Sequence, residues 1–301
     1  KQEEMQHHIK LLLEGVGGKV KSHAASISSG DIVLRVVDQP PTPLEVLRSA
    51  LKFNASQLLH EELKDYVMDC DTVDGRDMDA AAGGKSSKLK YVVGGMPRQS
   101  VNEISGAFAR NRLSLSALEL APLSLFNAFE YARPEIFRNE PFILLDIGHR
   151  KSTVVGGANG SIIMIRTIQY GGKTLLDDLM MNGAIDRDAA ILLIEQGDGG
   201  LADIAERSLQ LISREMLSSI GFYEAQLDRT VSILHVSGAA ARAVMVLQAL
   251  SDSLNFPCEA WDPFGSCDLA LPEDKRAALG ADGRSLNVAF GAALGSIRGR
   301  G

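Results

Sequence analysis

In the first 131 residues, stretches with hydrophobic positions at helical spacing alternate with short β-rich runs. Met5, Ile9 and Leu13 recur at helical spacing and predict an amphipathic helix that ends at the glycines from Gly15 onward. The β-rich runs predict strands at residues 32–37, 66–70, 89–94 and 113–120. The helical spacings predict helices at residues 42–58, 101–108 and 123–131, the first capped by Thr42.

The second part of the chain begins with its most hydrophobic strand pattern, Phe142–Gly148. Two further apolar runs, 152–157 and 161–168, flank Asn159-Gly160, which predicts a hairpin because both residues tolerate the positive φ of a type I′ turn. A long amphipathic helix is predicted over 202–226, with Ile204, Leu211, Ile212, Met216, Ile220 and Tyr223 facing inward. The remaining patterns predict a strand at 231–236, a helix at 240–254, a strand at 258–264 and a closing Ala- and Gly-rich helix at 286–298.

The composition excludes several broad classes of protein. Of the 301 residues, 45% are hydrophobic and 23% charged, as in ordinary globular proteins, and the formal net charge is −7. No basic block is present, which argues against a nucleic-acid binder or direct insertion into a membrane. The three cysteines form no metal-binding spacing and indicate a reducing compartment. No apolar run is long enough to cross a bilayer, so we expect membrane contact only through a partner.

Three glycine-containing turns could bind an anion. Asp146-Ile-Gly148 follows a buried strand, so backbone N–H groups there could face phosphate, with Ser152 as a hydroxyl donor and Asp146 holding a metal-bound water. Gly171-Gly172 precedes a helix, and Gly238 lies between a strand and a helix. Each pattern alone is also compatible with ordinary tight packing.

Other motifs favour simpler interpretations. The sequence from Ala82 to Ser86 has the end of a phosphate-binding loop but lacks its first glycine, and a surface loop is the better interpretation. His7 and His8 are adjacent on a helix, cannot jointly bind a metal, and are expected to face solvent. His235 lies in an apolar strand, where a hydrogen-bonded core residue is expected.

The order of these motifs resembles the actin-like ATPase superfamily, and within it the PilM class of type IV pilus assembly proteins. The resemblance covers nearly the whole chain. The segments that carry it begin at Leu34, Leu145, Tyr170, Arg214, Val236, Leu254 and Val288. It implies an α/β, actin-like (ribonuclease H-like) two-lobed fold with an inserted small subdomain of the FtsA type. The N-terminal phosphate hairpin of the family has no counterpart, which suggests that an upstream piece is missing.

The resemblance also implies a division of the chain. Residues 1–18 would be the remnant of the first large subdomain, 19–120 the inserted small α+β subdomain, and 121–140 the connecting helix of the first lobe. Residues 141–285 would form the second actin-like lobe, and 286–301 a closing helix that returns to the first lobe.

In the family, the matching positions bind ATP and magnesium. The resemblance puts Asp146, Gly148 and Ser152 at the phosphates, with Asp146 binding Mg²⁺ through water. It puts Gly171, Gly172, Arg214 and Glu215 near ribose and base, and Gly238 at the adenosine. Ala239 and Ala240 replace glycines of the adenosine turn, and His149 replaces an acidic group. Ala121 falls where a polar residue could orient water, so weak turnover or none is expected, and no catalytic residue is assigned.

The implied function is that of a cytoplasmic scaffold at the inner membrane of the pilus machine. It would bind the N-terminal cytoplasmic peptide of a PilN-like membrane protein through elements at about Leu34–Leu58 and Leu89–Leu118. Contacts with other pilus platform proteins and with further copies of the chain are also implied. The alternatives are an active ATP-dependent kinase or ATPase of the same superfold, and a scaffold of the secretion (GspL) or cytoskeletal (FtsA) type.

Overall fold

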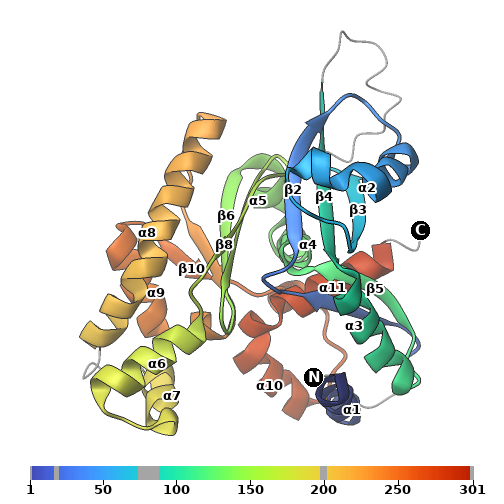
Figure 1. Ribbon diagram of the computed structural model, residues 1–301. Helices are drawn as coiled ribbons and strands as arrows, with labels where there is room; N and C mark the ends of the chain where they lie inside the picture. Colours follow the sequence, from blue (N-terminus) through green and yellow to red (C-terminus); the bar gives the residue numbers. More distant parts are fainter. Residues whose placement is uncertain (1, 17–19, 74–87, 197–201, 299–301) are drawn as a thin grey trace. The chain divides into compact units, whose positions relative to one another are not determined.

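A computed structural model of the chain describes residues 2–16, 20–73, 88–196 and 202–298 (Figure 1). The chain divides into two compact units, the first comprising Lys1–Ala121 with Ala292–Gly301, and the second Pro122–Gly291. The backbone therefore passes between the units twice, at the start of helix α4 (Ala121–Ala132) and within the last helix, α11 (Asn287–Arg298). The five-part division stays a prediction.

The first unit contains two separate sheets. Its elements are α1 (Gln2–Val16), β1 (His23–Ile27), β2 (Val33–Gln39), α2 (Leu44–Leu59), β3 (Tyr66–Thr72), β4 (Leu89–Pro97), α3 (Arg98–Arg110) and β5 (Leu115–Leu120). Strands β2, β4 and β3 form an antiparallel sheet in that order. Helix α2 packs on this sheet through Leu47, Leu51 and Ala55, which meet Tyr91 and Val93 of the central strand. Strands β1 and β5 pair in parallel.

Two details of the first unit differ from the sequence-based prediction. The sequence pattern did not predict strand β1, because its His-Ala-Ala-Ser-Ile sequence is only half-buried along its whole length and shows no clear alternation. Thr42 does not cap α2: its hydroxyl donates to the carbonyl of Pro40, and the N-cap position is held by Pro43 without a side-chain hydrogen bond. The hydroxyl of Tyr91 instead accepts from the backbone N–H of Thr42.

The second unit is built on one five-stranded sheet. Its strands are β6 (Pro141–Ile147), β7 (Ser152–Ala158), β8 (Ser161–Ile168), β9 (Leu234–Ser237) and β10 (Cys258–Ala260). Its helices, besides α4 and the start of α11, are α5 (Pro134–Asn139), α6 (Gly172–Gly183), α7 (Arg187–Gln196), α8 (Ala202–Leu227), α9 (Val244–Leu254) and α10 (Glu273–Asp282). The strand order is β10-β9-β6-β7-β8, with β6 antiparallel to β7 and parallel to β9.

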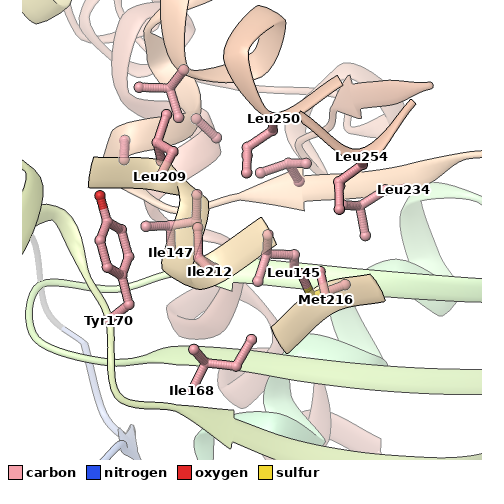
Figure 2. Close-up of a cluster of buried hydrophobic side chains, with 14 of the residues drawn as sticks. Leu145, Ile147, Ile168, Tyr170, Leu209, Ile212, Met216, Leu234, Leu250 and Leu254 are labelled. Atoms are coloured by element: carbon pink, nitrogen blue, oxygen red, sulfur yellow. The ribbon is translucent and has the colours of Figure 1, made fainter. Parts of the chain in front are cut away.

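Both faces of β6 are buried, and the period of two along the strand sends alternate side chains to different cores. Ile143, Leu145 and Ile147 join the core under α8 and α9. Figure 2 shows Leu145 and Ile147 on the side of the sheet that carries Ile212 and Met216 of α8. Phe142 and Leu144 enter the opposite core with Phe129, Phe137 and Trp261. The near-continuous apolar sequence of β6 is explained by this two-sided burial.

The hairpin at Asn159-Gly160 is confirmed, since these residues have φ of 52° and 77°, both in the left-handed region. The predicted Ala- and Gly-rich closing helix packs closely against α4. A methyl group at Gly291 in α11 would lie 1.7 Å from the carbonyl oxygen of Ser124 in α4, so only glycine permits this approach. Asp186 caps α7, because its carboxylate accepts from the N–H of Ala189.

Several predictions for the second unit are wrong in detail. The helix predicted over 240–254 is interrupted at Ala243, where a 3-10 turn (Ala239–Arg242) precedes α9. The predicted strands at 231–236 and 258–264 are shorter in the structure, and α10 was not predicted. Leu211 was predicted to face inward from α8 but is 47% exposed. It lies one position before Ile212 and so falls outside the buried stripe that contains Ile212 and Met216.

The remaining sequence features have simple structural outcomes. His7 and His8 are both exposed, as predicted. The loop sequence from Ala82 to Ser86 lies outside the described residues. The three cysteines are free thiols. Across the described ranges, none of the helices combines the length and apolarity that a membrane crossing requires.

Candidate functional site

Three of the predicted turns meet at one edge of the second unit's sheet. Strands β6 and β9 run parallel, and Asp146 lies opposite Ser237 in their register. Asp146 is two residues before Gly148, and Ser237 is directly before Gly238. From here the chain leaves β6 toward β7 on one side, and leaves β9 through α9 toward β10 on the other. Such a switch point beyond the carboxyl ends of parallel strands is where open α/β sheets bind ligands.

Asp146 is the acidic group at this edge. Its carboxylate accepts a hydrogen bond of 2.8 Å from the hydroxyl of Ser237. Burial raises the pKa of Asp146, and the Ser237 hydrogen bond opposes the rise only in part. The residue keeps partial exposure to solvent although its carboxyl group is densely surrounded. Within the described residues Asp146 forms no ion pair, so a bound cation would act as the counter-ion of its carboxylate.

The turn after β6 is held firmly against the start of α6. The N–H of Gly172 donates to the carbonyl of Gly148 at 2.9 Å, and the N–H of Lys173 donates to the carbonyl of His149 at 2.7 Å. A methyl group at Gly171 would lie 2.7 Å from backbone atoms of Gly148, His149 and Arg150. The glycine pair therefore serves close backbone packing, and its first helical N–H groups are already paired.

Ser152 is fully buried at the first residue of β7. Its hydroxyl donates to the backbone carbonyl of Tyr170 at 2.7 Å, so its single proton is engaged within the protein. Tyr170 is fixed from its other end by Ser208 of α8, at 2.9 Å between the hydroxyl oxygens, and Ser208 donates to Asp178 at 2.5 Å. These contacts join β7, the start of α6 and α8 into one rigid frame.

Gly238 closes the site on the β9 side. Its φ of 94° is disfavoured for any residue with a side chain, and a methyl group there would lie 2.3 Å from the carbonyl oxygen of Ile147. The N–H of Gly238 donates to the carbonyl of Arg284, whose guanidinium donates to the carbonyl of Ala241. The first glycine of the predicted adenosine turn is thus required by the local backbone.

Arg214 and Glu215 belong to the middle of α8. Both are exposed on α8, and Glu215 pairs with Arg166 of β8 at 3.3 Å. They stand six and seven residues beyond Ser208, which contacts Tyr170, so about 9–10 Å of helix separates them from that contact. No hydrogen bond or ion pair within the described residues joins them to Asp146, Gly148 or Gly238.

The residues at this edge allow a magnesium ion only together with a ligand. Within the described ranges there is no cluster of three or more His, Cys, Asp or Glu side chains that could hold a metal ion. Asp146 alone fits the mode in which Mg²⁺ is held by one carboxylate, waters and substrate phosphates.

An open hollow of about 560 Å³ lies at the C-terminal end of α8, lined by Glu224, Asp228, Arg229 and Thr230, and contains none of the predicted site residues.

The structure adds residues that the sequence did not single out. Ser237 holds Asp146, and Arg284 holds Gly238. The alternating register of two parallel strands is the signal that could have paired Ser237 with Asp146, but the pairing of β6 with β9 spans 91 residues and no local pattern reveals it.

Comparison with known proteins places the fold. No protein-family model matches the chain, and no curated protein matches it in sequence. A chain of the solved "PilM-PilN type IV pilus biogenesis complex" superposes with a TM-score of 0.83 at 19% sequence identity, covering 98% of this chain and 85% of that chain. The chain has the fold of that PilM–PilN structure. The predicted resemblance to the PilM class is thus confirmed at the level of the fold, and with it the actin-like fold class.

More distant likenesses include an ethanolamine utilization protein EutJ from Carboxydothermus hydrogenoformans, with a TM-score of 0.45, 16% identity and coverage of 83% of this chain and 72% of that chain. MreB 5 of Spiroplasma citri bound to AMPPNP also has a TM-score of 0.45, with 12% identity and coverage of 68% and 66%. At these TM-scores the two structures add nothing to what the PilM-type match shows about the fold of this chain.

Proposed function

We propose that this protein is a PilM-type scaffold of a type IV pilus assembly platform. In this role it binds ATP with magnesium in the second unit and the N-terminal cytoplasmic peptide of a PilN-like membrane protein in the first. The single observation that carries the proposal is the TM-score of 0.83 over 98% of the chain with the PilM–PilN structure. The location that follows is the cytoplasmic side of the inner membrane, reached through the partner.

The nucleotide part of the proposal is supported by the edge formed by β6 and β9. Asp146 is an enclosed carboxyl group without a counter-ion in the described chain, at the switch point of the sheet, between two glycine turns whose backbones approach each other closely. In this assignment Asp146 orients the waters of Mg²⁺, and Gly238 lets the chain turn tightly beside the nucleoside. Bound ATP supplies the phosphates that complete the coordination of the metal.

The peptide part is supported by the surface of the first unit. Helix α2 buries Leu47, Leu51 and Ala55 against its sheet, while Phe53 is 86% exposed and Val46 56% exposed. These two residues are seven positions apart and share one helix face. An exposed phenylalanine and an exposed valine on one helix face, about two turns apart, are the kind of surface that captures an apolar peptide.

Binding of the peptide is tested by titrating the full-length protein with a synthetic N-terminal cytoplasmic segment of the PilN-like protein from the same genome. We expect binding that Phe53→Glu weakens at least about tenfold, since burying a charge in an apolar contact is costly. Met181→Glu is the matched control, because Met181 is 80% exposed on α6 of the other unit. Equal loss in both variants, or no binding by the wild type, would contradict the peptide proposal.

Binding of nucleotide is tested by calorimetric titration of the full-length protein with ATP and magnesium. Asp146→Ala should weaken binding, whereas Asp188→Ala, which removes an exposed carboxylate from α7, should not. Affinity unchanged by Asp146→Ala would reject the assignment of the site. Steady-state phosphate release at enzyme-like rates would instead favour the alternative of an active ATPase or kinase.

A further inference from the structure

The turn between β6 and β7 is strongly basic in a chain whose net charge is −7. Arg150 is exposed and Lys151 half-buried, directly after Gly148 and the exposed His149. Neither cation takes part in an ion pair within the part of the chain that the structure describes. Neighbouring cations differ in this respect, because Lys173 pairs with Asp177 and Arg166 pairs with Glu215.

The backbone of this turn is fixed before any ligand arrives. Two N–H groups of α6 donate to the carbonyls of Gly148 and His149, and Gly171 packs against the backbone of Arg150. The N-terminus of α6, the positive end of its helix dipole, therefore lies against the turn. Because this backbone is already fixed, a ligand that contacts the side chains of the turn binds at a lower entropy cost.

Some of the groups that could donate to phosphate at this edge are occupied. The hydroxyl of Ser152 donates to Tyr170, and the N–H groups of Gly172 and Lys173 donate to the turn. The cationic side chains of Arg150 and Lys151, which take part in no ion pair within the described residues, remain available to a phosphate at the switch point. The guanidinium of Arg284, which donates to Ala241, adds a further positive charge on the β9 side.

We propose that Arg150 and Lys151 are the phosphate-binding side chains of this site, and that they let it hold a polyphosphate without a metal ion. The proposal deepens, and rests on, the nucleotide site of the proposed function. Two cations in a fixed turn neutralise charge that a metal ion otherwise neutralises, and Arg offers bidentate contact to phosphate oxygens. Magnesium bound near Asp146 then adds to the affinity but is not required for it.

The test is calorimetric titration of the full-length protein with ATP and, separately, with inorganic tripolyphosphate, each in magnesium and in EDTA. Wild type should bind both ligands in EDTA. The double variant Arg150→Ala/Lys151→Ala should bind both at least about 30-fold more weakly, from the loss of two charge-assisted contacts. Arg150→Gln/Lys151→Gln, which keeps side-chain length, should lose as much.

The control is Arg187→Ala/Arg207→Ala, which removes two exposed cations from α7 and α8 of the same unit and should bind as wild type does. Unfolding followed by the fluorescence of Trp261 confirms that each variant is folded. If the basic turn variants bind ATP as tightly as wild type, or if EDTA abolishes binding by wild type, the inference is overturned while the nucleotide proposal stands. Binding of tripolyphosphate that depends on the turn, with no binding of ATP, would retain the inference and reject the nucleotide proposal. Binding of neither ligand overturns both.

Discussion

His235 makes the stability of the second unit depend on pH. It lies in β9, is 3% exposed, and its ring stands 4.9 Å from that of Phe129. Burial lowers the pKa of His235 to about 4, with Glu259 opposing the shift and Arg133 adding to it. The prediction of a core residue is confirmed, and the ring nitrogen Nδ1 of His235 has no hydrogen-bond partner in the described structure.

The direction of the effect follows from which state binds the proton. Below pH 6.5 the unfolded chain protonates His235, whereas the folded protein does not until about pH 4. The free energy of unfolding therefore falls as the pH drops from 6.5 toward 4. At about 1.4 kcal/mol for each unit of pKa difference, the loss reaches about 3 kcal/mol, a large part of the stability of an ordinary domain.

The assay is urea unfolding of wild type and His235→Leu at pH 7 and pH 4.5, followed by the fluorescence of Trp261. This residue is the only tryptophan of the sequence, is 1% exposed, and lies 5.1 Å from the same Phe129 ring, so it reports on this core. Wild type should lose about 2–3 kcal/mol more than the variant between the two pH values. The exposed His149, replaced by Gln, is the control and should keep the wild-type profile. Equal losses in wild type and His235→Leu would refute the reasoning.

Three further predictions concern packing at the site and the closing helix. Ser152→Ala should lower the free energy of unfolding, measured in urea, by about 1 kcal/mol through loss of one buried hydrogen bond. Gly291→Ala should lower it by about 2 kcal/mol or more in urea unfolding, because the methyl group meets the carbonyl of Ser124 and this outweighs a gain of about 1 kcal/mol in helix propensity. Gly238→Ala should lower it by at least about 2 kcal/mol, through its positive φ and the contact with Ile147, and a midpoint equal to wild type would contradict that geometry.

Elements with a strong local signal could be predicted from the sequence. The apolar run of β6, the Asn159-Gly160 hairpin and the long amphipathic α8 each carry their own periodicity or turn chemistry, and all are present. The break at Ala243 could not be predicted, because a run of alanines favours a continuous α-helix and contains no local signal for a 3-10 turn. Strand β1 depends on pairing with β5, about 90 residues away, and has little hydrophobicity of its own.

The site was predictable as a set of turns but not as an arrangement. The positions of Asp146, Gly148 and Gly238 follow strand ends that the sequence marks, and the structure brings them together at one edge. The partners of Ser152 and Glu215 could not be predicted, because a hydroxyl or a carboxylate looks the same in sequence whether it binds a ligand or a neighbouring residue. Their binding roles, like those of the other site residues, stay predictions.

The two passages of the backbone between the units, at α4 and within α11, set the order in which the protein can be completed. The second unit is one continuous segment, whereas the first needs residues from both ends of the chain. On the ribosome, the last turns of α11, where Ser296 contacts Ser116 at 2.9 Å, emerge only after the entire second unit has been synthesised. The early segments of the first unit therefore lack their contacts with α11 until its last turns have been synthesised. A nascent chain stalled shortly before these turns would expose that unit to chaperones and proteases.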